Sequence, residues 1–304
     1  MVIVKLWGGL GNQLFQYALY LSYKEKGVKS KLDKSFFESV HEHNGYELEK
    51  VFGLHPDYAS TSEKITAKAI SKFFLKPFNH PYDEKKWGYG YYNERVANLH
   101  FGYLKGYWQT EKYFKAIEEK IKKQFIFPSL TDEENITTLK KITATNSVSI
   151  HIRRGDYLHS NRDWAMNIDY YKNAIQLINQ KIQDPYFFIF SDDMNWVKEN
   201  IILENVVFVD WNKKENSFID MQLMSACKHN IIANSSFSWW GAWLNANPNK
   251  IVIAPDNWVD MQGTRDVLPE EWIQLPADYF LFHFSKEAIL YFNDNHFNNR
   301  TPGC

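Results

Sequence analysis

The chain has 304 residues, of which 44% are hydrophobic and 23% charged, and its formal net charge is −1. This composition is that of a folded globular protein with room for roughly two domains of ~150 residues. The near-neutral charge argues against a nucleic-acid partner, which normally requires a basic surface. Only two cysteines, Cys227 and Cys304, are present, which excludes a disulfide framework and a cysteine-type metal site and favours a reducing compartment.

The first residues do not follow the pattern of a signal peptide, and no apolar run approaches the ~20 residues that span a bilayer. We therefore expect a cytoplasmic protein, and peripheral association with the inner face of a membrane stays open. Aromatic residues make up 17% of the chain. Most must serve core packing, but flat rings also suit the apolar faces of sugars.

The N-terminal half begins with a predicted strand at residues 2–6, a glycine loop at 8–11 and a helix at 14–24, which is the opening of an α/β unit. Residues 30–86 have weak periodicity, and no elements are assigned there. Aromatic residues are dense from 87 to 114. A charged helix is predicted over 111–124, and a break at 128–129 precedes a new helix cap at 131–134.

From residue 147 onward, predicted strands alternate with predicted helices, which favours a parallel sheet covered on both faces. We place the domain boundary within 128–145, giving lobes at 1–140 and 141–304, with a helix over 285–292 that can cross back to the first lobe. The expected strands are 147–152, 186–190, 206–209, 231–233 and 251–254, and the expected helices are 170–182, 194–201, 218–228 and 236–245.

Four polar segments stand at strand-to-helix junctions, where open α/β sheets bind ligands. The first is the glycine loop Gly8-Gly9-Leu10-Gly11-Asn12-Gln13. Its glycines allow close backbone approach, and the following helix start offers N–H groups to an anion. The loop lacks the spacing of a dinucleotide fingerprint and the Lys-Ser/Thr of a P-loop, so a simple tight turn is an equal alternative.

The second segment follows the strand at 147–152 and contains His151, Arg153, Arg154 and Asp156. Two arginines that leave a buried strand are costly unless an anion meets them, and the arginine fork matches phosphate oxygens. Because neighbouring residues point to opposite sides, we expect one arginine to face the ligand directly. The structural alternative is an ion pair with Asp156.

The remaining segments are Asp192-Asp193 and the run from Asn234 to Gly241. The paired carboxylates could hold a metal-bound diphosphate, accept the N–H groups of a guanine, or cap the next helix. Ser235 and Ser236 open a predicted helix and can offer side-chain and backbone donors to a phosphate. A capping role alone explains one serine better than the whole run.

Together these segments resemble the bacterial-type α-1,2-fucosyltransferases within the GDP-fucose-using enzymes. The resemblance runs through GGLGNQLFQYA at 8–18, GYWQTEKYF at 106–114, HIRRGDY at 151–157, FSDD at 190–193 and NSSFSWWGAWL at 234–244. It implies an α/β fold of the GT-B type, with two Rossmann-like lobes facing each other across a cleft. It also implies GDP-L-fucose as donor, a β-galactoside as acceptor, and inversion without a metal. Animal members carry a membrane anchor that is not seen here, which fits a bacterial cytosolic enzyme.

The resemblance also implies roles for individual residues. The N-terminal lobe would take the galactose-terminated acceptor and the C-terminal lobe the donor, in glycan or O-antigen biosynthesis. Arg153 would contact the diphosphate, His151 would lie beside the nucleotide, and Asp192 or Asp193 would recognise guanine. The further binding residues are Gly11 and Asn12 across the cleft, together with Arg154, Asn234, Ser235, Ser236 and Phe237.

An inverting transfer also requires a base for the acceptor hydroxyl. Asp156 is the first candidate because it shares a strand end with the arginines, and His151 is the second; positioning of an arginine is an equal alternative for Asp156. Other linkages or acceptors, another nucleotide sugar and a carbohydrate-binding protein without catalysis remain competing interpretations.

Overall fold

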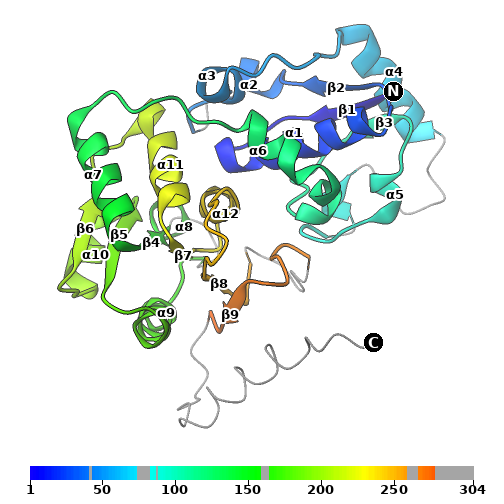
Figure 1. Cartoon of the computed structure of the whole chain (residues 1–304). Helices are drawn as coiled ribbons and strands as arrows, with labels where there is room; N and C mark the ends of the chain where they lie inside the picture. Colours follow the sequence, from blue (N-terminus) through cyan, green and yellow to red (C-terminus); the bar gives the residue numbers. More distant parts are fainter. Residues whose placement is uncertain (41–42, 74–82, 87, 159–163, 259–265, 278–304) are drawn as a thin grey trace, which may run out of the picture.

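The computed structural model describes residues 1–40, 43–73, 83–86, 88–158, 164–258 and 266–277, without the side chains of Phe73, Lys86 and Asp156. The predicted crossing helix at 285–292 lies outside the described residues. Two parallel sheets, one from each half of the chain, organise the molecule (Figure 1). The predicted α/β fold class, with a parallel sheet in each of two lobes, is confirmed.

The N-terminal sheet has the strand order β2-β1-β3, with β1 at Val2–Lys5, β2 at Ser30–Asp33 and β3 at Gly102–Leu104. Helix α1 (Leu10–Glu25) follows β1, and α4 (Thr61–Phe73) packs against β3 and β1 on the face that holds Ile3. Shorter helices are α2 (Phe36–Ser39), α3 (Leu48–Phe52), α5 (Glu94–Ala97) and α6 (Glu118–Gln124), with 3-10 turns at Glu84–Lys86, Glu111–Tyr113 and Lys115–Ile117.

Two expectations for this half were wrong in detail. The helix predicted over 111–124 is interrupted, because Phe114 leaves the helical region (φ −138°) and its ring stacks on Trp240 at 5.5 Å. Helix α1 begins at Leu10 rather than at residue 14. Gly11 lies inside α1, at a position where the start of the neighbouring helix, at Ser236 and Phe237, leaves no room for a side chain.

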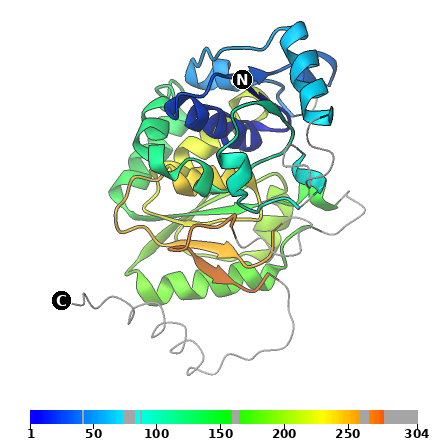
Figure 2. The same cartoon turned by 90° about the vertical axis from the view of Figure 1, so that its right-hand side faces the viewer.

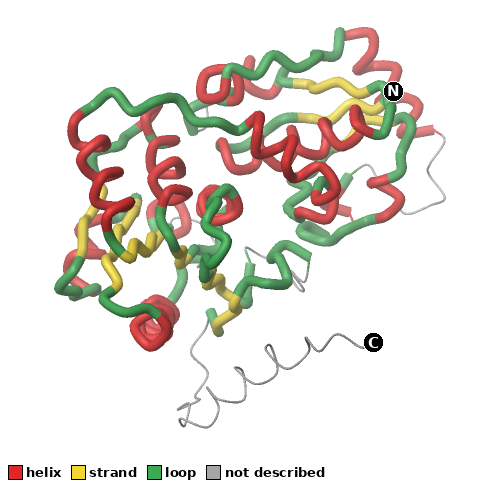
Figure 3. The backbone as a smooth tube through the Cα atoms, viewed as in Figure 1, coloured by secondary structure: helices red, strands yellow, loops and turns green. Residues whose placement is uncertain are grey.

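The C-terminal sheet has the strand order β6-β5-β4-β7-β8-β9, and every pairing is parallel. This is the strand order of a dinucleotide-binding fold: β5 and β6 are added on one side of β4, and β7, β8 and β9 on the other, so the order reverses between β4 and β7. Helices cover both faces of the sheet (Figures 2 and 3). The strands are β4 (Asn146–Ile152), β5 (Pro185–Ser191), β6 (Val206–Val209), β7 (His229–Ile231), β8 (Val252–Pro255) and β9 (Ile273–Leu275). The helices are α7 (Glu133–Ala144), α8 (Gly155–Leu158), α9 (Ile168–Lys181), α10 (Met194–Asn200), α11 (Phe218–Ala226) and α12 (Ser236–Trp243), with a 3-10 turn at Lys214–Asn216.

Strand β7 lies two residues earlier than the predicted 231–233. Its first residues are polar, which hid them from a hydrophobicity pattern. Asn230 is nevertheless fully buried, because its side-chain amide donates to Ser149 Oγ and to the Met224 carbonyl. Buried polar groups are tolerated in a strand when their hydrogen bonds are made.

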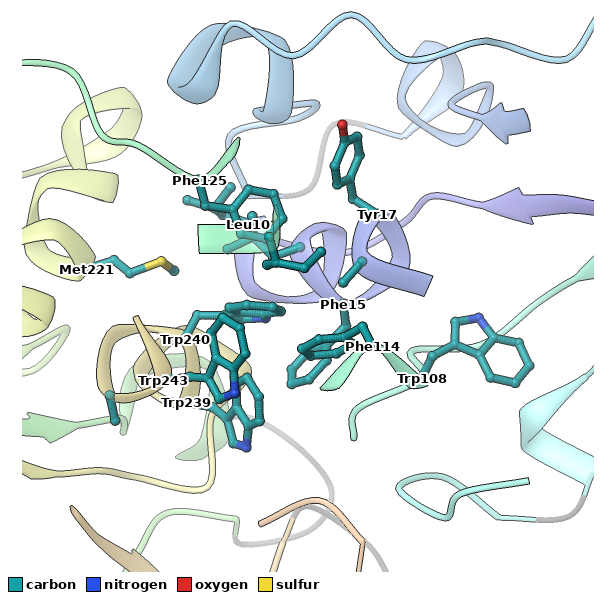
Figure 4. Packing of buried hydrophobic residues seen from close by; sticks show 14 of the residues in the cluster. Leu10, Phe15, Tyr17, Trp108, Phe114, Phe125, Met221, Trp239, Trp240 and Trp243 are labelled. Atoms are coloured by element: carbon teal, nitrogen blue, oxygen red, sulfur yellow. The ribbon is translucent and has the colours of Figure 1, made fainter. Parts of the chain in front are cut away.

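One aromatic core joins the two halves of the chain (Figure 4). The ring of Phe15 in α1 lies 4.5 Å from that of Trp239 and 5.0 Å from that of Trp240, both in α12. Large aromatic side chains supply most of the apolar area in such a contact. The packing of α1 on α12 therefore fixes where the N-terminal ends of these two helices meet.

Candidate functional site

The carboxyl ends of β4, β5 and β7 are neighbours in the sheet, and they bring three of the predicted segments together. His151 is paired with Phe190, and β7 lies on the other side of β4. Arg153 and Arg154 therefore follow the central strand, with Asp192 and Asp193 to one side and the segment after Asn234 to the other. This is the topological switch point at which open α/β sheets bind ligands.

Each arginine forms an ion pair with one of the aspartates after β5. Arg153 Nη1 lies 3.0 Å from Asp192 Oδ2, and Arg154 Nε lies 3.2 Å from Asp193 Oδ2. The Arg154 guanidinium also lies 3.7 Å from the ring centroid of Trp196. The ion-pair partners that the structure shows are therefore Asp192 and Asp193. The alternative partner considered from the sequence, Asp156, has a side chain outside the described part of the structure.

The two aspartates also organise the backbone at this edge. Asp192 Oδ1 accepts hydrogen bonds from the backbone N–H groups of Arg154 (2.9 Å) and Gly155 (3.1 Å). Asp193 Oδ1 accepts from Trp196 N and caps α10, a role that the sequence allowed. A cap of this kind contributes about 1 kcal/mol. Both carboxylates hold the arginine loop and the next helix in place.

His151, near the end of β4, is buried beside the start of α12. It is 6% exposed, and its ring lies 5.8 Å from that of Phe237. Burial and the nearby charge of Arg153 lower the pKa of His151 to about 4, so its imidazole is neutral at pH 7. His151 Nδ1 and Asn234 Oδ1 are buried and have no hydrogen-bond partner among the described residues. Buried polar atoms without partners are uncommon in folded proteins.

The loop between β7 and α12 is tied to the rest of this edge. The Tyr157 hydroxyl donates to the Asn234 carbonyl (3.1 Å), and the Asn234 amide donates to the Trp164 carbonyl (3.0 Å). Ser235 caps α12 by accepting from Phe237 N. The first turn of α12 contains no acidic residue, so the partial positive charge of this helix end is not offset by its own sequence.

The glycine loop of the N-terminal half touches the start of α12 directly. A Cβ atom on Gly11 would lie 2.5 Å from the Ser236 carbonyl carbon and 2.6 Å from Phe237 N. Contacts this short do not occur, so only glycine fits. The structure thus brings Gly11, and with it the neighbouring Asn12, close to Ser236 and Phe237.

Asn12 has a defined environment at this junction. Its Oδ1 accepts a hydrogen bond from Gln109 Nε2 (2.7 Å), and Gln109 Oε1 accepts one from the Trp258 indole N–H (2.9 Å). Gly8 has a φ of +76°, and a Cβ on it would lie 2.7 Å from Asn12 Nδ2. The backbone conformation of Gly8 favours glycine, and a side chain there would displace the Asn12 amide.

Several residues at this junction were not singled out from the sequence. Gln109 lies inside the motif at 106–114, but that motif gave it no role. The exposed His43 lies against Gly9, with its Cγ 3.4 Å from where a Cβ on Gly9 would be, and it adopts φ +54°. Glu47 is buried, which raises the pKa of its carboxyl group, and the Leu10 N–H at the start of α1 offsets a small part of that rise. Trp258 lies beyond the predicted strand and carried no signal.

Among the described residues, no group of three or more histidine, cysteine, aspartate or glutamate side chains could hold a metal ion. Within the same residues, no helix combines the length and the apolar character that crossing a bilayer requires.

The chain is similar to solved structures at low sequence identity. The fucosyltransferase NodZ from Bradyrhizobium is 11% identical, with a TM-score of 0.45 over 79% of this chain and 91% of that one. An ADP-heptose lipopolysaccharide heptosyltransferase II from E. coli is also 11% identical, with a TM-score of 0.45 over 97% of each chain.

Sequence relatives are closer. An α-1,2-colitosyltransferase from Escherichia coli is 34% identical, over 90% of this chain and 99% of that protein. The O-antigen biosynthesis glycosyltransferase WbnK, also from Escherichia coli, is 32% identical over 89% and 99%. Galactoside α-(1,2)-fucosyltransferase 1 from Lagothrix lagotricha is 27% identical over 61% and 56%. Residues 59–276 match glycosyl transferase family 11, and the chain belongs to this family of glycosyltransferases.

Proposed function

We propose that this glycosyltransferase moves L-fucose from GDP-L-fucose to the 2-hydroxyl of a terminal β-galactoside, with inversion, in glycan or O-antigen biosynthesis. The observation that carries the proposal is that Arg153 follows β4 and α12 follows the neighbouring strand β7, so that both stand at the switch point of the C-terminal sheet, where the His151 ring lies 5.8 Å from that of Phe237. An arginine fork beside a helix N-terminus matches a diphosphate. Family membership supplies the reaction class, and relatives named for α-1,2-transfer support the linkage.

The two halves of the chain have different roles in this proposal. Residues 141–304 bind the nucleotide sugar, since they contain the switch point. Residues 1–140 bind the acceptor and contribute Gly11 and Asn12 from the opposite side. We place the reaction in the cytoplasm, where peripheral association with the inner face of a membrane would bring a lipid-borne acceptor within reach.

The departing GDP gains negative charge as the bond to fucose C1 breaks, in a transition state with oxocarbenium character. Arg153 and Arg154, together with the backbone N–H groups of Ser236 and Phe237, would balance that charge. Asp192 and Asp193 keep the arginines in position, and their remaining lone pairs can accept the two N–H groups of the guanine edge. His151, neutral and buried beside Phe237, would line the nucleotide.

The acceptor hydroxyl must give up a proton, and three residues are candidates to take it. Asp156 follows the arginines on α8 and stays the first candidate. His151 has a pKa of about 4, which makes it a weak base at neutral pH. His43 is exposed beside the glycine loop of the acceptor half. Asp156→Asn, His151→Gln and His43→Gln should be compared for turnover and for GDP affinity; the base is the residue whose loss abolishes turnover and spares affinity.

Catalysis without a metal follows from the same charge arrangement, because arginines and a helix end can take the place of a cation on the diphosphate. Full transfer activity is expected after treatment with EDTA. Loss of activity that Mg²⁺ or Mn²⁺ restores would instead assign Asp192 and Asp193 to a metal.

Transfer of colitose, the 3-deoxy form of L-fucose, is the second candidate function, and the colitosyltransferase relative favours it. GDP release should be measured from GDP-fucose, GDP-colitose and GDP-mannose, with lactose or N-acetyllactosamine as acceptor and linkage analysis of the product. The proposal expects GDP-fucose to give the highest kcat/KM. Faster release from GDP-colitose would reassign the donor, and binding of the acceptor without any release would reveal a non-catalytic protein.

A further inference from the structure

Three side chains from distant parts of the sequence form a chain of hydrogen bonds beside the glycine loop. The Trp258 indole, after β8, donates to Gln109 Oε1 at 2.9 Å, and Gln109 Nε2 donates to Asn12 Oδ1 at 2.7 Å. Trp258 is 2% exposed and Gln109 is 7% exposed, so water has little access to either. Hydrogen bonds in such an environment are costly to leave unmade.

The donor and the acceptor at each step of this chain of hydrogen bonds are determined by Trp258. An indole N–H is always a donor, so the Gln109 amide must turn its oxygen toward Trp258. Its NH₂ group then faces Asn12, which must accept through Oδ1 and turn its own NH₂ group the other way. An amide whose oxygen and nitrogen are hard to distinguish is thus given a fixed orientation by the network around it.

Asn12 lies in the first turn of α1, next to the residue at which the two helix starts meet. Asn12 Nδ2 is held over Gly8, where a Cβ would approach it to 2.7 Å, and it makes no hydrogen bond to any described residue. The adjacent Gly11 touches the backbone of Ser236 and Phe237. Asn12 therefore offers a donor group one residue away from the contact between α1 and the start of α12.

We propose that Gln109 is a positioning residue, and that with Trp258 it keeps Asn12 oriented as a hydrogen-bond donor to an oxyanion of the nucleotide-sugar diphosphate. This inference rests on the proposed function, because it needs a donor substrate with a charged leaving group. With the opposite orientation Asn12 would present its carbonyl oxygen to the diphosphate and repel it. Trp258 belongs to the donor half, so the orientation of Asn12 depends on correct contact between the two halves.

The test reverses which groups donate and which accept in the hydrogen-bond chain of Trp258, Gln109 and Asn12, while nearly keeping the size and shape of the side chains. In Gln109→Glu the carboxylate can only accept, so it accepts from both Trp258 and Asn12 and forces the Asn12 amide to turn over. We expect kcat/KM for the nucleotide sugar to fall by about 100-fold, the loss typical for one oxyanion donor, with little change in KM for the acceptor. Gln109→Met is the matched control: it removes both hydrogen bonds without inverting Asn12, and we expect a loss of about 10-fold.

The Asn12→Ala background separates positioning from a general structural effect. Once Asn12 is absent, Gln109→Glu and Gln109→Met should have equal kcat/KM, because neither has an amide left to orient. Equal losses in the wild-type background, a difference that persists without Asn12, or losses that simply follow the thermal unfolding midpoint would each overturn the proposal. Trp258→Phe removes the indole donor that fixes the orientation of the Gln109 amide. Its kcat/KM for the nucleotide sugar should lie between those of wild type and Gln109→Glu.

The same experiment distinguishes this inference from the proposed function. Wild-type enzyme that releases no GDP from GDP-fucose contradicts the proposed function. In that case the kcat/KM values of the Gln109 variants are compared with whichever nucleotide sugar the wild type turns over. The inference is then judged only by the order of those values.

Discussion

Helices α1 and α12 begin next to each other, and their N-terminal ends differ in their caps and in the acidic groups near them. The start of α1 has no side-chain cap, but a buried carboxylate from the same half, Glu47, faces its first N–H group. The start of α12 is capped by the neutral hydroxyl of Ser235 and has no acidic residue in its first turn. Arg153 adds a positive charge on the α12 side, and Asp192 offsets part of it.

The difference assigns separate tasks to the two ends. An anion near a helix N-terminus is worth about 0.3–1 kcal/mol when exposed and more when partly buried. The start of α1 already faces the carboxyl group of Glu47, and it contributes a directed side chain, Asn12. The start of α12 has no acidic residue in its first turn, which leaves it able to bind the charged part of a ligand.

The largest expected effect comes from separating the two ends. Gly11→Ala places a Cβ within 2.7 Å of the Ser236 and Phe237 backbone, which must move the helices apart and should abolish transfer. Overpacking of this kind costs about 1–3 kcal/mol of stability. Gly9→Ala is the control, because Gly9 has φ −72° and its nearest neighbour would be a side chain at 3.4 Å. Transfer assays and thermal unfolding of both variants check this; an active Gly11→Ala protein would show that the contact is not needed.

The next largest effect concerns charge on the α12 side. Arg153→Ala should reduce kcat by about 100- to 1000-fold, as expected for loss of a group that stabilises a developing anion. Arg154→Ala should have a smaller effect on kcat, because the Arg154 guanidinium is stacked on Trp196 and paired with Asp193. Steady-state kinetics with the donor varied would measure both, and a larger loss in Arg154→Ala would exchange their roles.

A moderate effect is expected from pH, through His151. Its pKa in the folded protein is about 4, whereas an unfolded histidine titrates near 6.5, so between these values the unfolded chain binds more protons. The free energy of unfolding should therefore fall as the pH drops from about 6.5 to 4. Urea unfolding of wild type and His151→Gln at several pH values measures this, and the variant should lose less stability. If the free energy of unfolding falls equally with pH in the two proteins, the pKa of His151 is not lowered in the folded state.

The smallest effects should come from the caps themselves. Ser235→Ala should cost about 1 kcal/mol of stability. Glu47→Gln removes the carboxyl group that faces α1 and should leave donor KM nearly unchanged, since we propose that the diphosphate binds at the start of α12. Unfolding midpoints and donor KM values for both variants provide the check. A large rise of donor KM in Glu47→Gln alone would reverse the assignment of the two ends.

The regular alternation of strands and helices after residue 147 was predictable from the sequence, because parallel strands buried on both faces give continuous apolar runs. The segments after β4, β5 and β7 could be placed at one edge for the same reason. Residues 30–86 could not be assigned, since β2 is only four residues long and its last residue is a buried aspartate, Asp33. The pairing of the arginines with Asp192 and Asp193 needed the register between β4 and β5. The roles of Gln109 and Trp258 depend on a contact between residues 149 positions apart, which no local pattern contains.

The central claim is that Arg153 and the start of α12 hold a nucleotide diphosphate. Calorimetric titration of GDP, with GMP as control, into wild type and Arg153→Ala tests it most directly. We expect wild type to bind GDP more tightly than GMP, and Arg153→Ala to lose most of that preference while staying folded. Equal affinity of the two proteins for GDP, or no binding of GDP to wild type, would contradict it.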